Sequence, residues 1–350
     1  METVRVCLVG AGRAGMVHGV NLARHVPGAR VVAVVDEREE ARRRAAAELG
    51  ASADFPTLRD ALQAAEFDAV VIATPTYTHR DLAVEAARAG KHIFCEKPMA
   101  IDAEQALAMI EAARSAGVVL QIGFMRRFDE DFVRARALIE AGEIGEPLFI
   151  RSTTRGPGLP PPWAWDTAKS NGMLAEVNSH DFDCVRWLAG SEYERVFARV
   201  RARKAEEPRR LHPDFYDVAV VTVELADGTL GAIDGACPSD YGYDARVEVL
   251  GSRGLLTVGQ VPDGTVVQVT QDGRVTRQAF RSWRDRFRTG YLGEAREFVE
   301  CVRTGRVPRV TGVDGLRALE AVLAAVKSIA SGVPEPVVRH AVAAGEAARR

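Results

Sequence analysis

The first 122 residues alternate short apolar runs with longer stretches that mix apolar and charged positions. The apolar runs scarcely alternate with polar residues, which is typical of strands buried on both faces of a parallel sheet. We expect such strands at residues 4–9, 29–35, 69–73, 92–95 and 118–122. The intervening stretches are rich in Ala, Arg, Glu and Leu and predict helices at 14–25, 38–49, 58–64, 81–89 and 103–116. This alternation predicts a parallel sheet with helices on both faces.

From about residue 123 the pattern changes to strand-like runs joined by turn signals. Asp227-Gly228 and Asp272-Gly273 each separate two apolar runs, which is a strong hairpin signal. The strands expected here are 217–225, 229–236, 245–250, 255–258, 266–270 and 275–279. Helices are expected at 126–141, 174–188, 292–303 and 313–331, and a loop at the proline-rich stretch 156–162.

The two patterns predict an α/β protein of two domains, for which 350 residues are sufficient. The first, at 1–122, would hold the parallel sheet. The second, at 123–340, would be an α/β domain with a large, mostly antiparallel open sheet, and 341–350 would form a polar tail.

The net charge, the apolar runs and the cysteines argue against several classes of protein. The formal net charge is −2, whereas a protein that binds nucleic acid through the phosphate backbone needs a basic excess. No apolar run approaches the roughly 18–20 residues that span a bilayer, and the N-terminus lacks a secretory signal pattern. The five cysteines are scattered and form no C-x-x-C pair. We therefore expect a cytoplasmic protein with reduced thiols that binds no nucleic acid, membrane or metal.

A glycine motif, Gly10-Ala11-Gly12-Arg13-Ala14-Gly15, lies between the first predicted strand and the first predicted helix. Asp36 follows the second strand, at about the spacing expected of a carboxylate that binds the ribose of a dinucleotide. Its charge would repel a 2′-phosphate and favours NAD, although Arg38 could accept that phosphate and leaves NADP open. The alternative is a tight turn with no ligand.

Two further strand ends carry candidate site residues, because ligands bind at the carboxyl ends of parallel strands. Thr74, Pro75 and His79 follow one strand and could contact the nicotinamide half of the cofactor. Alternatively, Pro75 only turns the chain and His79 begins the next helix.

Glu96-Lys97-Pro98 follows the strand at 92–95, and Pro98 constrains the backbone of Lys97. The chain has only five lysines. A lysine, unlike an arginine, can exchange its proton near neutral pH in a suitable environment. The alternative is an ordinary surface lysine.

Glu176 and His180 are four residues apart in a predicted helix, which would place them on one helix face, with Asp183 three residues further on. A histidine flanked by carboxylates suits proton transfer at neutral pH. The alternative is a surface pair with no role.

Together these segments resemble the Gfo/Idh/MocA family of NAD(P)-dependent oxidoreductases, from about residue 4 to residue 332, and most of all its inositol 2-dehydrogenases. The segments that carry the likeness are GAGRAG, ATPTYTH, CEKPMA, GFMRRFD, AGEIGEP, EVNSHDFDC, YGYDARVEVLG and SWRDRFRTGY.

The resemblance implies a Rossmann domain followed by an α/β domain whose sheet mediates oligomers. It also implies hydride transfer from a polyol or sugar hydroxyl to NAD, with Lys97 and His180 as catalytic residues. Glu176 stands where the family usually has aspartate, and Asn171-Gly172 where it has a glycine pair. Cofactor contacts would come from Gly10, Gly12, Arg13, Ala14, Gly15, Asp36, Arg38, Thr74, Pro75, His79, Glu96 and Lys97. Substrate contacts would come from Arg127, Glu176, His180, Tyr243, Trp283 and Tyr291.

Some alternatives to these roles remain. Trp283 and Tyr291 could be core aromatics, and Arg127 a cation on a helix surface. On the strand at 217–225 the outer positions are still half apolar, which suggests burial in a homodimer or homotetramer, or against a ligand.

The function we expect is NAD-dependent oxidation of a secondary hydroxyl of a cyclitol or sugar. A related sugar or keto-sugar oxidoreductase, a relative that uses NAD in glycosidic cleavage and a non-catalytic NAD-bound regulator are the alternatives. A regulator would be expected to lose the Lys97 and His180 pair, which this chain retains.

Overall fold

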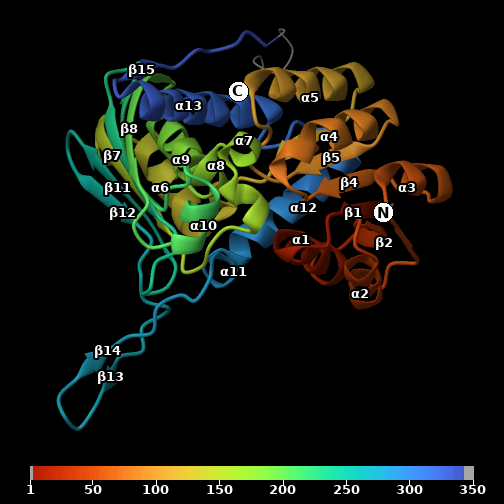
Figure 1. Ribbon diagram of the computed structural model, residues 1–350, viewed down its shortest axis with the longest axis horizontal. Coiled ribbons are helices and arrows are strands. Elements are labelled where there is room, and N and C mark those ends of the chain that lie inside the picture. The colour runs from red at the N-terminus through yellow and green to blue at the C-terminus, as the bar shows by residue number, and fades with distance from the viewer. Residues whose placement is uncertain (1–2, 343–350) are drawn as a thin grey trace. The chain divides into compact units, whose positions relative to one another are not determined.

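The computed structural model describes residues 3–342 and resolves the chain into two compact units (Figure 1). The first unit takes the chain up to Phe128 together with Thr289–Leu319, and the second takes Asp129–Arg288 with Glu320–Val338. The units therefore interleave along the sequence, and the predicted domain limits at 122 and 340 stay a prediction. Most of the predicted tail, residues 343–350, lies outside the described residues.

The first unit contains a six-stranded sheet in which every neighbouring pair of strands is parallel. Its strand order is β3-β2-β1-β4-β5-β6, the arrangement of a doubly wound dinucleotide-binding sheet. The strands are β1 (Val4–Val9), β2 (Ala29–Val35), β3 (Ala53–Phe55), β4 (Ala69–Ile72), β5 (His92–Cys95) and β6 (Leu120–Ile122). The predicted parallel sheet is confirmed, and β3 is a strand that the sequence pattern did not indicate.

Helices of the first unit connect these strands, and their ends follow local sequence signals. The side chain of Asp102 caps one helix by accepting a hydrogen bond from the Gln105 amide, and Gly117 ends that helix in a left-handed conformation. The helices are α1 (Arg13–Arg24), α2 (Glu39–Leu49), α3 (Leu58–Ala64), η1 (Thr76–Thr78), α4 (His79–Arg88), α5 (Ala103–Ala116), η2 (Met125–Phe128) and α12 (Arg288–Thr304). One core cluster joins α1, α2 and the first strands to Phe298 of α12. A late segment of the chain thus helps to build the first unit.

The second unit contains a seven-stranded sheet of order β12-β11-β7-β10-β9-β8-β15. Only β7 and β10 pair in parallel, so the predicted mostly antiparallel sheet is confirmed. Asp227-Gly228 joins β9 to β10 as expected. The strands are β7 (Pro147–Arg155), β8 (Tyr193–Arg201), β9 (Val218–Leu225), β10 (Leu230–Ala236), β11 (Asp244–Gly251), β12 (Leu255–Val258) and β15 (Glu335–Pro336).

Helix α9 packs against β7 and β10, and α13 contributes Ser328, whose hydroxyl accepts a hydrogen bond from the Ala198 amide of β8. The helices of this part of the chain are α6 (Glu130–Glu140), η3 (Pro162–Trp165), α7 (Thr167–Ser170), α8 (Gly172–Glu176), α9 (Ser179–Ala189), α10 (Glu206–Leu211), α11 (Trp283–Arg286) and α13 (Gly312–Ser331). Among the helices of the described residues, none is long and apolar enough to cross a bilayer.

Predicted elements were wrong in extent in three places. The helix expected at 126–141 is broken at Asp129, whose extended backbone separates η2 from α6 and whose carboxylate binds Arg286. The predicted strands around Asp272-Gly273 shrink to β13 (Gln268–Val269) and β14 (Val275–Thr276), in a hairpin that extends from its unit (Figure 1). The third is the helix expected at 174–188, which is interrupted between α8 and α9.

Candidate active site

The turn between β1 and α1 has the shape that a dinucleotide phosphate requires. Gly10 has a positive φ of 97°, and a Cβ there would lie 2.6 Å from the Ala73 carbonyl oxygen. A Cβ on Gly15 would overlap the Gly10 carbonyl. Gly12 is different, because nothing lies within 4 Å of the position its Cβ would take. The turn is packed tightly at Gly10 and Gly15 and stays open at Gly12, where backbone can approach a pyrophosphate.

Asp36 follows β2 and binds the same turn. Its Oδ2 accepts a hydrogen bond from the Ala11 amide at 2.9 Å, and Oδ1 accepts one from the Arg38 amide at 3.0 Å. Burial raises the pKa of Asp36, but the hydrogen bonds from Arg38 and Ala11 and the Arg38 charge outweigh it and lower that pKa. The carboxylate is therefore ionised at neutral pH and suited to accept from ribose hydroxyls. The Arg38 side chain pairs with Asp36 and is otherwise exposed.

His79 is held inside the first unit and begins α4. Its ring nitrogens lie 2.9 Å from the carbonyl oxygens of Pro98 and Thr74, and the residue is 1% exposed. The alternative expected from the sequence, in which Pro75 turns the chain and His79 begins the helix, matches this geometry. Contact of Thr74, Pro75 or His79 with a cofactor stays a prediction.

Lys97 follows β5 and is partly buried. Its amide donates to Oε2 of Glu96 at 3.1 Å, and the peptide bond to Pro98 is cis. The side chain of Glu96 is buried and its carboxylate binds His18. Lys97 therefore lies at the end of β5, next to Glu96, whose side chain is anchored in the interior. Contact of Glu96 with a cofactor stays a prediction.

In the second unit, His180 lies in the first turn of α9 and is buried. The next residue, Asp181, anchors this turn to the sheet. Its Oδ1 accepts hydrogen bonds from the hydroxyls of Ser152 at 2.6 Å and Thr154 at 2.9 Å, and Oδ2 accepts one from Asn178 Nδ2 at 2.8 Å. These contacts fix the start of α9, and with it the position of His180.

The predicted placement of Glu176 and His180 on one helix face was wrong. Glu176 is the last residue of α8, and His180 belongs to α9. The Asn178 carbonyl accepts from the amides of Asp181 and Phe182, so a new helix starts there. Because the Asn178 side chain also binds Asp181, local side-chain bonding replaces continuous helix.

The segment before Glu176 shows why glycine is needed there. Asn171 and Gly172 both have positive φ, 58° and 74°. A Cβ on Gly172 would lie 2.7 Å from the Tyr216 hydroxyl oxygen, which itself accepts from the Leu174 amide and donates to the Asn171 carbonyl. The close approach of Tyr216 fixes the path of the chain into α8.

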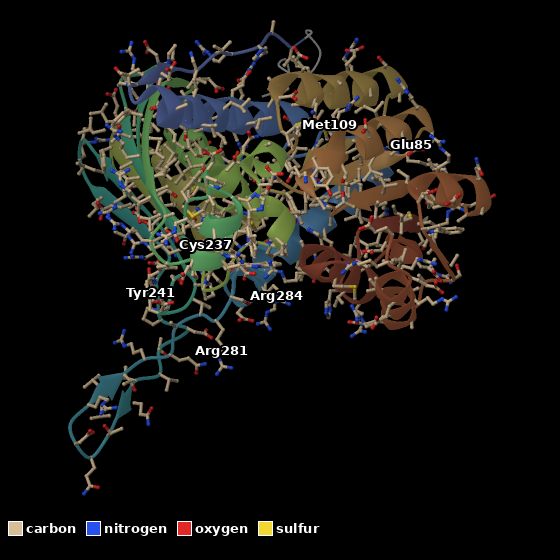
Figure 2. The ribbon with its side chains drawn as sticks, viewed as in Figure 1. Glu85, Met109, Cys237, Tyr241, Arg281 and Arg284 are labelled. Atoms are coloured by element: carbon tan, nitrogen blue, oxygen red, sulfur yellow. The ribbon has the colours of Figure 1, made fainter. Side chains whose placement is uncertain are left out.

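The remaining substrate candidates divide between the units. Arg127 and Tyr291 belong to the first unit and are 4% exposed. Arg127 pairs with Asp314 at 3.2 Å, so the alternative of a cation on a helix surface is wrong. Tyr243 and Trp283 belong to the second unit, where Tyr243 is buried against Phe287. The Arg284 guanidinium (Figure 2) lies over the Trp283 ring at 5.4 Å.

Each unit thus gathers its own part of the candidate set. The first brings together the glycine turn, Asp36, Thr74, His79, Glu96 and Lys97 with Arg127 and Tyr291, and the second contains Glu176, His180, Tyr243 and Trp283. The sequence reasoning missed Asp181, Asn178, His18 and Glu294. No local motif marks His18 or Glu294. For Asp181, one sign was available in the sequence. Ser152 and Thr154 occupy alternate positions of β7, which indicates polar side chains on the same face of that strand.

Comparisons with known proteins agree with this geometry. A sequence model of the Gfo/Idh/MocA oxidoreductase family, described as an NAD-binding Rossmann fold, matches residues 4–124, and its C-terminal alpha/beta domain matches residues 136–337. The chain is 35% identical to the scyllo-inositol 2-dehydrogenase (NAD(+)) of Bacillus subtilis, over 95% of both chains. It is also 35% identical to the myo-inositol 2-dehydrogenase of Thermotoga maritima, over 86% of this chain and 89% of that one.

A solved structure of scyllo-inositol dehydrogenase from Lactobacillus casei, with bound NAD(H) and scyllo-inositol, superposes with a TM-score of 0.88. The two sequences are 28% identical, and the match covers 96% of this chain and 99% of that one. The open glycine turn and the ionised Asp36 supply the groups that such a cofactor needs. This protein is therefore a member of the Gfo/Idh/MocA family of NAD-binding oxidoreductases.

Proposed function

We propose that this enzyme oxidises a secondary hydroxyl of a cyclitol with NAD. The observation that carries the proposal is the 35% identity, over 95% of both chains, to a relative named for scyllo-inositol oxidation with NAD(+). The ionised Asp36 at the end of β2 supports NAD over NADP, because a 2′-phosphate would meet its negative charge.

We assign to Lys97 and His180 the removal of the proton from the substrate hydroxyl and the stabilisation of the charge that this leaves. Bound NAD would supply the hydride acceptor, the C4 carbon of its nicotinamide ring. His180 would act as the general base that removes the hydroxyl proton. The Lys97 ammonium would donate a hydrogen bond to the same oxygen and stabilise the negative charge that develops on it. Asp181 supports this assignment, because its bonds to Ser152 and Thr154 hold the helix turn that carries His180.

Substrate recognition would fall to Arg127, Glu176, Tyr243, Trp283 and Tyr291, as the family likeness implies. Polar groups directed at hydroxyls discriminate a cyclitol from an apolar alcohol, because each unmatched polar group costs binding energy. Glu176 is one methylene longer than the usual aspartate, so we expect the preferred cyclitol or hydroxyl to differ from that of an aspartate-bearing relative.

A substrate screen tests the function. Purified protein is incubated with NAD or NADP and each inositol isomer, aminocyclitols or common aldoses, and reduced cofactor is measured by absorbance. We expect turnover with at least one cyclitol and NAD, at a higher kcat/KM than with any aldose. Preference for an aldose would support a sugar oxidoreductase instead, and binding of NAD without turnover on any substrate would support a regulator.

The outer face of the second unit's sheet supports a homo-oligomer, a dimer or a tetramer. Leu255, Leu250, Phe149 and Leu230 lie on neighbouring strands and pair in register across β12, β11, β7 and β10. The three leucines are 45–54% exposed. Such an apolar row on a sheet face is typical of a surface that another subunit covers. We call these four residues the leucine row.

We further propose that the enzyme acts in the cytoplasm, where the five free cysteines would stay reduced.

A further inference from the structure

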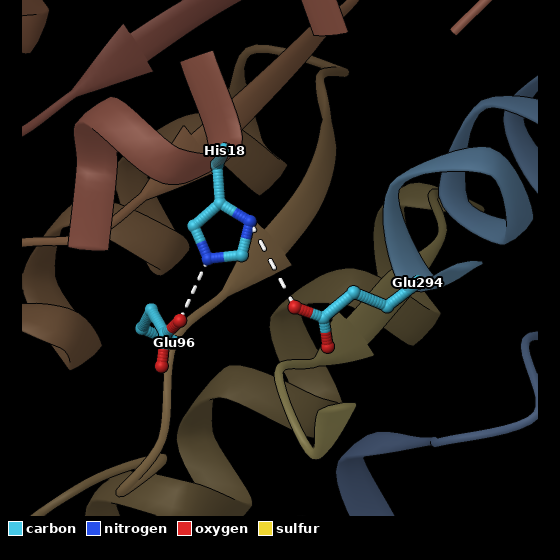
Figure 3. Close-up of side chains that lie close together, drawn as sticks. All are labelled: His18, Glu96 and Glu294. Carbon is cyan, nitrogen blue, oxygen red and sulfur yellow. Dashed lines mark hydrogen bonds and ion pairs between the residues drawn. The ribbon is translucent and has the colours of Figure 1, made fainter. Parts of the chain in front are cut away.

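Three titratable side chains meet in the interior of the first unit (Figure 3). His18 comes from α1, Glu96 follows β5 and Glu294 comes from α12. His18 Nε2 lies 2.6 Å from Glu96 Oε1, and His18 Nδ1 lies 3.8 Å from Glu294 Oε1. Their side chains are 2%, 8% and 0% exposed. We call these three residues the buried triad.

Two members of the buried triad, His18 and Glu96, are joined by a direct hydrogen bond. The ligand atoms all lie within 4.8 Å of one another, as a cation would require. However, 2.6 Å is the length of a direct, charge-assisted hydrogen bond. Two ligands of one cation cannot keep that bond, because the cation replaces the proton between them.

Glu96 connects the buried triad to Lys97. One carboxylate oxygen binds His18, and the other accepts the Lys97 amide at 3.1 Å. Gly123 packs against this carboxylate. A Cβ on Gly123 would lie 3.4 Å from Oε2 of Glu96. Burial raises the pKa of Glu96, but the hydrogen bond and charge of His18, the Lys97 charge and the Lys97 amide together lower it. Glu96 is therefore ionised, and its two oxygens tie α1 to the main chain of Lys97.

Glu294 differs from Glu96 in its surroundings. Neither of its carboxylate oxygens has a hydrogen-bond partner among the described residues. Burial, and then the negative charge of Glu96, raise the pKa of Glu294 well above its ordinary value. An ionised carboxylate so placed would be costly, so its surroundings favour the neutral carboxylic acid form of Glu294.

The other titratable groups that face the buried triad leave these assignments unchanged. The rings of Tyr291, on α12, and His18 form a T-shaped pair with their centroids 5.6 Å apart. Burial raises the pKa of Cys95, so that this thiol stays neutral. His79 of α4 is engaged by the carbonyl oxygens of Thr74 and Pro98. Within the buried triad, the ionised carboxylate is that of Glu96.

We propose that His18 and Glu96 are positioning residues for Lys97. The bond from His18 fixes the orientation of the Glu96 carboxylate, which in turn holds the Lys97 amide and places a negative charge beside the lysine. This inference rests on the proposed role of Lys97 in the oxidation. It adds a connection between α1, which begins at the dinucleotide turn, and the reacting end of the site.

Matched variants at the two glutamates test the proposal, because the same substitution should have opposite outcomes. Glu96→Gln removes a negative charge, so we expect kcat to fall by about 30-fold or more while the Kd for NAD changes by less than about threefold. Its pH profile should also differ from that of the wild type, because Glu96 carries a negative charge beside Lys97 and glutamine carries none. Glu294→Gln replaces one neutral group by another, and kcat should stay within about threefold. Equal losses in both variants would overturn the proposal.

His18→Phe should lower kcat as much as Glu96→Gln does. The double variant should be no slower than either single variant, because both changes break one unit. Leu22→Ala, which empties a buried position one turn further along α1, is the control. It should lower the melting temperature and leave kcat and the pH profile unchanged. Loss of kcat in Leu22→Ala equal to that in His18→Phe would mean that His18 acts only through stability.

Lys97→Ala separates the failure of this inference from the failure of the proposed function. If Lys97→Ala loses turnover and His18→Phe and Glu96→Gln do not, only the positioning role is overturned. If Lys97→Ala keeps full turnover, the proposed role of Lys97 fails and the inference fails with it.

Nitrogen NMR of the wild-type histidines gives a readout that does not depend on turnover. We expect the His18 Nε2 signal to be protonated and to change in Glu96→Gln, and an unchanged signal would contradict the bond.

Discussion

The Asp36 carboxylate accepts a hydrogen bond from the Ala11 amide at 2.9 Å, which ties the end of β2 to the glycine turn after β1. We propose that this side chain, which braces the turn, also accepts hydrogen bonds from the ribose of the dinucleotide.

Asp36→Ala should weaken NAD binding by about tenfold or more and reduce the preference for NAD over NADP, because it removes the carboxylate that we propose to bind ribose and repel a 2′-phosphate. Calorimetric titration with each cofactor measures both effects. Arg38→Ala is the matched variant, since it removes the Asp36 partner and leaves the carboxylate. Unchanged affinity for both cofactors in Asp36→Ala would show that Asp36 does not bind the ribose.

Asp181→Ala should destabilise the protein by about 2–4 kcal/mol, because it leaves the buried hydroxyls of Ser152 and Thr154 without their acceptor. Turnover should fall while NAD affinity is kept, since the first unit is unaffected. Urea unfolding, cyclitol kinetics and NAD titration measure these effects. Glu224→Ala, at an exposed position of β9, should change stability by less than about 0.5 kcal/mol. Full turnover in a folded Asp181→Ala variant would contradict the anchoring of His180.

Glu297 gives a prediction for acid stability. Its carboxylate accepts two bonds from Arg306 and one from the Arg309 amide. Burial raises the pKa of Glu297, but these bonds and the two arginine charges outweigh it and hold the pKa below the ordinary value of 4.5. Because the folded pKa is the lower one, Glu297 stabilises the fold above about pH 4.5, and this contribution is lost as the pH falls through the folded pKa.

Glu297→Gln should therefore cost about 1–3 kcal/mol at neutral pH and progressively less below about pH 4.5. Urea unfolding of the wild type and the variant across this range measures the difference. A difference that stays constant at every pH would mean that the ionised carboxylate contributes nothing specific.

The leucine row predicts that assembly depends on the outer sheet face. Leu230→Glu combined with Leu250→Glu places two charges in it and should yield a monomer in analytical ultracentrifugation, because a charge is costly to bury in an interface. Leu211→Glu, on α10 and equally exposed, is the control and should keep the wild-type mass. An unchanged mass in the double variant would exclude this face as the interface.

The sequence predicted those features of the site that depend on neighbours in the chain. A glycine motif between a strand and a helix, with an acidic residue after the next strand, predicted the turn and Asp36 because short βαβ connections leave few alternatives. The antiparallel sheet was likewise predictable at Asp227-Gly228, where the turn residues set the pairing of β9 and β10.

Long-range contacts decided the rest. The helix pattern at 174–188 is unbroken in sequence, but Asn178 binds Asp181, which is itself held by β7, and the helix divides there. His18 and Glu294 are 276 positions apart in the sequence and carry no local signal. Only packing of α12 against the first sheet brings them together.

The amino-acid sequence by itself determined the two kinds of sheet and the dinucleotide turn, because these follow from periodicity and from glycine's freedom at close contacts. It also indicated the family, through the resemblance of whole segments. The tertiary structure alone decided which carboxylates carry charge. Ionisation depends on burial and on the donors that folding places around each group, and Glu96 and Glu294 meet opposite surroundings a few ångströms apart.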